Sequence, residues 1–244
     1  MEADNLSQEK LDQLLWSFAQ TKDTDKIKYL IALGADVNSK GSDGLSPIWH
    51  AVNRNNLSHV KLFVSEGADC TINNGKISLL MLAVMWSYKD IIKLLLLNVK
   101  CDYNYLNEKG QNVLYTAVSH LNKKIIKLLI RYSPVNIDHC DDAGDSVLGF
   151  LCSIVNYNNR RSKKIMKLLL DAGANVNIQG KTHRLTPLMI ACKHGNYRAI
   201  KLLLKDPNID LDLKNADGKN ALDLISEDYL RKMMLKNIYS RISM

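Results

Sequence analysis

Short apolar runs alternate with polar segments along the chain, and within each run the apolar residues recur at helical spacing. Two of the clearest runs are Ile91 to Leu96 and Ile125 to Ile130, each interrupted by one lysine. Apolar residues at adjacent positions and at positions three or four apart lie on one side of a helix. We expect each helix to bury one side on a partner helix and another on the next pair. The pattern therefore predicts helix pairs that are stable only when stacked.

Two short phrases repeat in step with these runs. The first stands at Gly34 to Asn38 and Gly173 to Asn177, and its first three residues recur at Gly67 to Asp69. The second stands at Ser46 to Ala51 and at Thr186 to Ala191. Weaker copies of the second phrase start at Ser78, Asn112, Ser146 and Asn220. The six starts are 32, 34, 34, 40 and 34 residues apart, and such a period indicates a solenoid of stacked units.

These phrases resemble the ankyrin repeat, whose helix-turn-helix units open with a Thr-Pro-Leu-His-x-Ala motif. The resemblance covers nearly the whole chain and implies an all-α solenoid with short β-hairpin loops. Carried backwards, the register makes Gln13 to Ala19 and Ile27 to Leu33 an atypical first unit. We expect a single domain over residues 1–244, with atypical caps at both ends. The expected repeats are 7–40, 41–73, 74–106, 107–140, 141–179, 180–214 and 215–244.

The chain departs from the family pattern at the fourth position of the opening motif, where histidine is usual. The residues found there are Trp49, Met81, Tyr115, Gly149, Met189 and Asp223. The usual histidine forms hydrogen bonds between neighbouring loops, so its loss predicts a greater reliance on apolar packing and a lower stability than an idealised array has. Glycines also recur just before the first helices, as expected of hairpin turns that need a positive φ. They are Gly44, Gly75, Gly110, Gly144 and Gly218.

The 40-residue step comes from a segment about six residues longer than its counterparts, Asn156 to Ser162. We expect it to form a polar, basic loop between the two helices of the fifth repeat, either for recognition or as a tolerated insertion.

The final segment, Ser226 to Met244, is basic and has apolar residues at helical spacing. It predicts the last repeat's second helix and a cap, or a docking helix for a partner.

The net charge of +8 raises the question of nucleic-acid binding, but the distribution of the charge matters more than its size. Six lysines share one position in the second helix of successive repeats. They are Lys28, Lys61, Lys93, Lys127, Lys167 and Lys201. A stripe of this kind is typical of a solvated outer face, so nucleic acid is an unlikely partner. Binding of an anionic partner, nucleic acid or lipid, through this stripe is the alternative.

Five cysteines without a CxxC pair are typical of a reducing compartment, and Cys152 and Cys192 fall where the repeat has a small core residue. The longest apolar stretch, Ile91 to Leu97, is far shorter than the ~20 residues that span a membrane, and the first residues lack the pattern of a signal peptide. We therefore expect no membrane span and an intracellular protein, cytoplasmic or nuclear, or one exported into a host cell by an unconventional route.

Motifs for catalysis or cofactor binding are weak. Gly180 to Thr182 looks like the end of a phosphate-binding loop, but Asn175 stands where that motif needs glycine. His139 to Asp142 contains metal-ligand types, yet no second cluster supplies the remaining ligands. The histidines are scattered across the repeats, and no nucleophile stands at a spacing from them that is typical of a catalytic motif. The sequence therefore predicts no catalytic site, no cofactor and no metal.

The resemblance implies a non-catalytic interaction module, a scaffold, adaptor or inhibitor that binds a protein through its hairpin tips and concave face. An effector of a virus or intracellular bacterium acting on a host protein is another possibility, and a monomer is expected. The fifth, eighth and ninth positions of the opening motif should face outward, and an exposed tryptophan is a common binding anchor. With two arginines of the longer loop, the expected partner-binding residues are Leu82, Met85, Trp86, His120, Phe150, Ile154, Arg160 and Arg161.

Overall fold

A computed structural model describes residues 6–97, 101–154, 160–226 and 228–242. It divides the chain into two compact units, residues 1–108 and 109–244, and each unit is described by itself. The expected single domain over residues 1–244 stays a prediction. The described residues form helices joined by loops, with β pairing limited to the isolated bridges Asn73–Ser78 and Cys140–Ser146. The predicted all-α repeat fold with short hairpins is confirmed.

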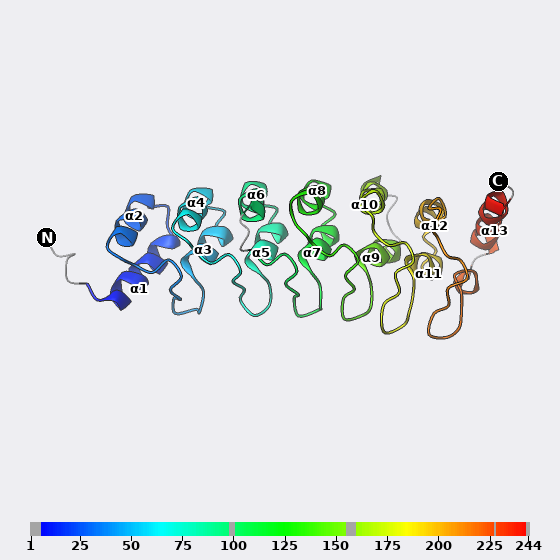
Figure 1. Cartoon of the computed structure of the whole chain (residues 1–244), viewed down its shortest axis with the longest axis horizontal. Helices are drawn as coiled ribbons and strands as arrows, with labels where there is room; N and C mark the ends of the chain where they lie inside the picture. Colours follow the sequence, from blue (N-terminus) through cyan, green and yellow to red (C-terminus); the bar gives the residue numbers. More distant parts are fainter. Residues whose placement is uncertain (1–5, 98–100, 155–159, 227, 243–244) are drawn as a thin grey trace. The chain divides into compact units, whose positions relative to one another are not determined.

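The first unit contains three helix pairs. The first helices of the pairs are α1 (Gln8–Ala19), α3 (Pro47–Asn53) and α5 (Leu79–Met85), and the second helices are α2 (Thr24–Ala32), α4 (Leu57–Ser65) and α6 (Lys89–Leu97). Within this unit the first helices form one row and the second helices another, and the hairpins extend beyond the row of first helices (Figure 1). Each first helix contacts its own partner, and α3 contacts both α1 and α5, so the predicted stacking is confirmed within this unit.

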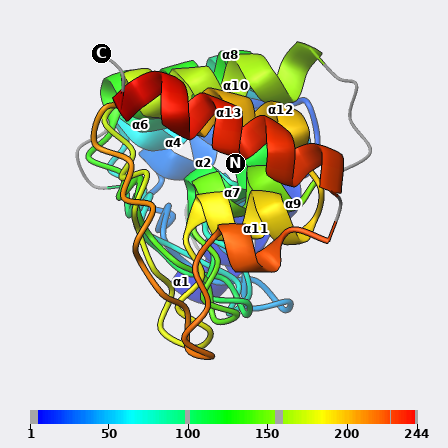
Figure 2. The same ribbon diagram turned by 90° about the vertical axis from the view of Figure 1, so that its right-hand side faces the viewer.

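The second unit continues the same pattern with three pairs and a cap. The pairs are α7 (Val113–Ser119) with α8 (Lys123–Tyr132), α9 (Val147–Ser153) with α10 (Arg160–Asp171), and α11 (Pro187–Lys193) with α12 (Tyr197–Leu203). A 3-10 turn at Leu222–Leu224 replaces the next first helix, and α13 (Asp228–Ile242) packs on α12 (Figure 2). Leu230 and Met234 of α13 are buried, and Met234 Sδ lies 3.8 Å from Cys192 Sγ of α11. The predicted final helix is therefore a cap on the core of this unit.

The opening motif works as a helix N-cap. The side-chain oxygens of Ser78, Asn112, Ser146 and Thr186 accept a hydrogen bond from the backbone N–H three residues ahead, which satisfies a donor with no intrahelical partner. The residue three ahead is the fourth position of the motif, and the residues found there, Met81, Tyr115, Gly149 and Met189, are all buried. Apolar packing at this position is thus observed, as predicted from the missing histidines.

In the part of the chain that the structure describes, four residues other than glycine adopt a positive φ. Asn55, Ser87 and Leu121 do so directly after a first helix, where the sixth repeat has Gly195. Arg184 does so in a hairpin, where other repeats have glycine. The predicted hairpin glycines Gly44, Gly75, Gly110, Gly144 and Gly218 all have positive φ as well. The backbone of the repeat is therefore kept even where the sequence lacks glycine.

Candidate protein-binding surface

The most exposed apolar residues of the predicted concave positions lie at the end of α5. Trp86 is the C-cap of this helix and is 59% exposed, and Met85 beside it is 38% exposed. Leu82, which we expected to face outward, is only 6% exposed. The expectation was wrong because α5 is a seven-residue helix whose first six residues are all buried. Only its last turn reaches the surface.

Polar contacts fix the backbone around this pair. Ser87 follows Trp86 with a positive φ of 61°, which turns the chain toward α6. The next residue, Tyr88, donates its hydroxyl hydrogen to the carbonyl oxygen of Asn53 at the end of α3, at 3.4 Å. The exposed indole of Trp86 therefore sits on a loop held to the neighbouring repeat.

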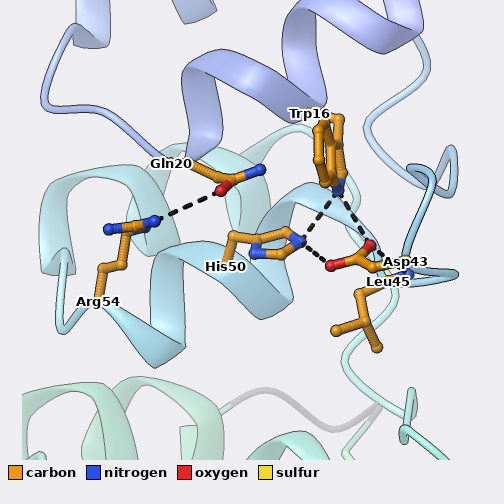
Figure 3. A network of polar contacts seen from close by, with 6 residues as sticks. All are labelled: Trp16, Gln20, Asp43, Leu45, His50 and Arg54. Atoms are coloured by element: carbon orange, nitrogen blue, oxygen red, sulfur yellow. Dashed lines mark hydrogen bonds and ion pairs between the residues drawn. The ribbon is translucent and has the colours of Figure 1, made fainter.

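The equivalent positions of the first two repeats are polar. Arg54, the C-cap of α3, donates from Nη2 to Oε1 of Gln20 at the end of α1, at 3.4 Å (Figure 3). The ends of α1, α3 and α5 thus place an amide, a guanidinium and an indole on successive repeats of the first unit. This arrangement offers one apolar anchor, Trp86, and a cation, Arg54, at the equivalent position of the preceding repeat.

A partly exposed polar network in the first unit was not predicted from the sequence. Trp16 Nε1 lies 3.2 Å from Asp43 Oδ1 and 2.9 Å from His50 Nε2, and His50 Nε2 lies 3.1 Å from Asp43 Oδ2 (Figure 3). Asp43 Oδ1 also accepts the N–H of Leu45 in the hairpin. The indole can only donate, so the Asp43 carboxylate accepts hydrogen bonds from the Trp16 indole and from the Leu45 backbone amide. It also accepts one from the His50 imidazole when Nε2 carries a hydrogen. The network joins α1, α3 and the hairpin between them.

Burial lowers the pKa of His50, and the nearby Asp43 carboxylate partly opposes this effect. Trp16 also packs against Gly41, where a Cβ atom would overlap the indole ring. Among the residues that the structure describes, the His50 ring contacts the Trp16 indole and the Asp43 carboxylate, and neither is a hydroxyl or a thiol. We interpret Trp16, Asp43 and His50 as a structural network that positions the hairpin before α3. The absence of a side chain at Gly41 was the one sequence signal that could have revealed it.

In the second unit the two apolar residues of the expected set are less exposed than Trp86. Phe150 is half-buried, and its ring centroid lies 5.0 Å from that of Tyr115. Ile154 is also half-buried. His120 is exposed and lies at the end of α7, where its Nδ1 is 2.9 Å from the carbonyl oxygen of Thr116. Because a carbonyl only accepts, Nδ1 carries the hydrogen and Nε2 is left as an acceptor. This surface is more polar than the end of α5.

The longer segment of the fifth repeat is only partly a loop. Residues 155–159 lie outside the described structure, but α10 begins at Arg160 and includes Arg161 and Ser162. The expectation of a loop up to Ser162 was therefore wrong for its last three residues. They extend the second helix instead, because the run from Arg160 to Asp171 has few helix breakers and many strong helix formers. Arg161 is exposed on this helix.

One hairpin of the second unit holds two groups whose pKa is raised, Cys140 and Asp145. Burial raises the pKa of Asp145, the Asp141 carboxylate raises it further, and His194, His183 and Lys193 oppose the shift. His139 Nε2 lies 2.6 Å from the carbonyl oxygen of Gly110 and is therefore the protonated nitrogen. Within the described residues, no group of three histidine, cysteine or acidic side chains could hold a metal ion.

Comparison with known proteins agrees with the geometry. Family models for ankyrin repeats match residues 14–107, 80–180 and 169–225. The chain belongs to the ankyrin repeat family, whose members are generally protein-interaction modules. None of the helices in the described part of the chain is both long enough and apolar enough to cross a membrane.

Similar proteins come from several sources. YahD of Escherichia coli strain K12, named as an ankyrin repeat protein, is 28% identical over 76% of this chain and 92% of its own length. The ankyrin repeat protein FPV014 of fowlpox virus is 31% identical over 63% of this chain, which spans 34% of that protein. The crystal structure of the ankyrin repeat domain of Bcl-3 superposes with a TM-score of 0.79 at 22% identity, over 91% of this chain and 97% of that one. That last likeness shows the fold alone.

Proposed function

We propose that the chain is a non-catalytic interaction module, a scaffold, adaptor or inhibitor, that binds a protein partner through the end of α5. The observation that carries the proposal is the pair Met85 and Trp86, which the fold leaves exposed on a repeat array. Adjacent exposed apolar side chains commonly mark an interface, and tryptophan and arginine are enriched among the residues that dominate binding. Arg54 supplies a cation on the preceding repeat.

The rigid backbone around the pair supports this role. The turn at Ser87 and the hydrogen bond from Tyr88 to Asn53 hold the loop before any partner arrives. A surface that is already ordered loses little conformational entropy on binding.

The five cysteines, all within the described residues, form no disulfide, which supports a reducing intracellular compartment as the place of action.

The test begins with capture of partners from cells that contain the protein, using the wild-type chain and its Trp86→Ala variant as baits. A partner captured by the wild type should bind the variant at least tenfold more weakly, which is about 1.4 kcal/mol. Met85→Asp should act in the same direction, and neither change should lower the melting temperature appreciably. Tyr29→Ala is the matched control, because Tyr29 is a similarly exposed aromatic residue on the outer helix α2.

Two results would refute the proposal. Unaltered affinity in Trp86→Ala would show that the end of α5 is not the interface. An equal loss in Tyr29→Ala would show that any exposed aromatic residue supports capture, and that the effect is not specific to this surface.

A further inference from the structure

A hollow in the second unit is lined mainly by cations. It lies between α10 and α12, neighbouring second helices of this unit (Figure 1). The hollow has a volume of about 330 Å³ and is lined by Lys163, Tyr197, Arg198, Lys201, Leu202 and Lys205. Its size is in the range of sites for small ligands, about 300–1,000 Å³. Four of its six lining residues carry positive charge, and none carries negative charge.

Two cations of the hollow lie close together on α12. Arg198 and Lys201 are three residues apart on this helix, so their side chains are neighbours, and Lys205 follows two residues after the helix ends at Leu203. Like charges at this spacing destabilise a helix. Among the described residues, Lys163, Lys201 and Lys205 form no ion pair with a carboxylate. The fold thus concentrates uncompensated positive charge in a concave site, and a bound polyanion would offset the repulsion.

A second, independent observation lies deeper between the same helices. A narrow inner hollow shares Lys163, Arg198 and Leu202 with the cationic one and is also lined by Ser162. Ser162 is only 9% exposed, and among the described residues its hydroxyl has no hydrogen-bond partner. Buried hydroxyl groups almost always have a partner. Ser162 and Lys163 also lie in the first turn of α10, where the helix dipole favours an anion.

We infer that this site binds a compact polyphosphate, with the lysines and Arg198 neutralising the phosphates. The inner hollow, about 20 Å³ in volume, has room for one water, through which the Ser162 hydroxyl donates to the nearest phosphate. Lysine and arginine are the usual phosphate-binding side chains. The exposed ring of Tyr197 gives the wall of the hollow an apolar face that fits a sugar or cyclitol ring. Such phosphates occur on free inositol polyphosphates and on the head groups of phosphoinositide lipids, and the shared chemistry is phosphates clustered on one small ring.

The experiment titrates inositol hexakisphosphate into the full chain by isothermal titration calorimetry. We expect saturable binding of one molecule per chain, and at least a tenfold loss of affinity in Arg198→Glu/Lys201→Glu. The matched control is Lys61→Glu/Lys93→Glu, which makes the same change in net charge and alters lysines at the same repeat position as Lys201, but in the first unit. Lys205→Gln provides a milder variant in case the double substitution unfolds the chain, and it should weaken binding severalfold.

Ser162→Ala should also weaken binding severalfold without a change in net charge. A second arm measures sedimentation with phosphatidylcholine vesicles that contain or lack phosphatidylinositol bisphosphate, and binding there would identify a lipid source. No binding of either probe would overturn the inference. An equal loss in both double variants would do so as well, because it would show a diffuse attraction to net charge. Unchanged affinity in Ser162→Ala would refute the role of the inner hydroxyl.

Discussion

Asn38 binds the backbone of Asp69 across one full repeat. Its Oδ1 accepts the N–H of Asp69 at 2.7 Å, and its Nδ2 donates to the carbonyl oxygen of Gly67 at 3.3 Å. In the second unit Asn177 makes the same pair of bonds to Asp210 and Asn208. The asparagine that ends the first repeated phrase therefore joins successive repeats through their loops, where the usual motif histidine is missing.

Replacing Asn38 with alanine should destabilise the first unit by about 1 kcal/mol, since both bonds are lost but water reaches the exposed groups. Urea denaturation followed by circular dichroism measures the change. Asn177→Ala should have a similar effect on the second unit. Ser42→Ala, at an exposed hairpin position, is the control and should leave the midpoint unchanged.

The two buried histidines of the first unit make its stability depend on pH. Burial lowers the pKa of His50 and also of His59, whose Nε2 contacts the hydroxyl of Thr24. Both folded pKa values lie below the ordinary value of 6.5, so the unfolded chain binds protons first as the pH falls. Stability should be fully present above pH 6.5 and should decline below it, down to the folded pKa values.

Denaturation measured at several pH values tests this dependence. His59→Gln should remove part of the decline. Asp43→Asn should steepen it, because loss of the carboxylate lowers the pKa of His50 further. A decline of the same size in the wild type and in both variants would contradict the assignment to these histidines.

The sequence predicts the repeats well because each unit carries its own local signals. Capping side chains, apolar spacing and hairpin glycines all act within a few residues, and the same signals recur in each repeat. The Trp16, Asp43 and His50 network could not be predicted, because Trp16 lies 27 and 34 residues before the other two and belongs to the preceding repeat. Leu82 was misplaced for a related reason: the motif gives its position in the helix, but neighbouring helices decide how far it is covered.

The clustering of charge in the cationic hollow could not be predicted from the sequence either. Lys201 was recognised as one lysine of an outer stripe, and it is exposed as expected. Its grouping with Lys163 depends on how α10 packs beside α12, and α10 begins within the segment expected to be a loop. The sequence therefore gave the charge at each position, while the clustering of charge required the packing of two helices from different repeats.

Leu129 tests the repeat core. It is fully buried in α8, and Leu129→Ala should cost about 2–5 kcal/mol, the usual range for a buried leucine. Because repeats stabilise their neighbours, the loss should spread to adjacent repeats of the second unit, which hydrogen exchange can detect. Leu128→Ala is the matched control, since Leu128 is only half-buried and should cost less. Equal effects would show that burial at this helix face was misassigned.

The cysteines should react slowly in the folded protein. Burial raises the pKa of Cys192 to about 12, and burial raises the pKa of Cys152 and of the half-buried Cys140. A thiol reacts as its thiolate, so iodoacetamide at neutral pH should label the native chain far more slowly than the urea-unfolded chain. Peptide mass spectrometry should find Cys140 labelled before Cys152 and Cys192. Fast labelling of Cys152 in the native state would contradict its burial.

Leu121 offers a direct gain in stability. It follows α7 with a φ of 50°, at the position where Gly195 has a φ of 64°. The left-handed region costs a residue with a Cβ atom roughly 1–2 kcal/mol relative to glycine, and some of that gain is lost to the greater freedom of glycine in the unfolded chain. Leu121→Gly should therefore raise the free energy of unfolding by about 1 kcal/mol. Asn55→Gly should give less, because asparagine tolerates this region. Gly195→Ala should reverse the effect, with a loss of about 1 kcal/mol. Thermal and urea denaturation of the three variants would measure this order, and destabilisation by Leu121→Gly would show that the leucine contributes more through packing than its backbone strain costs.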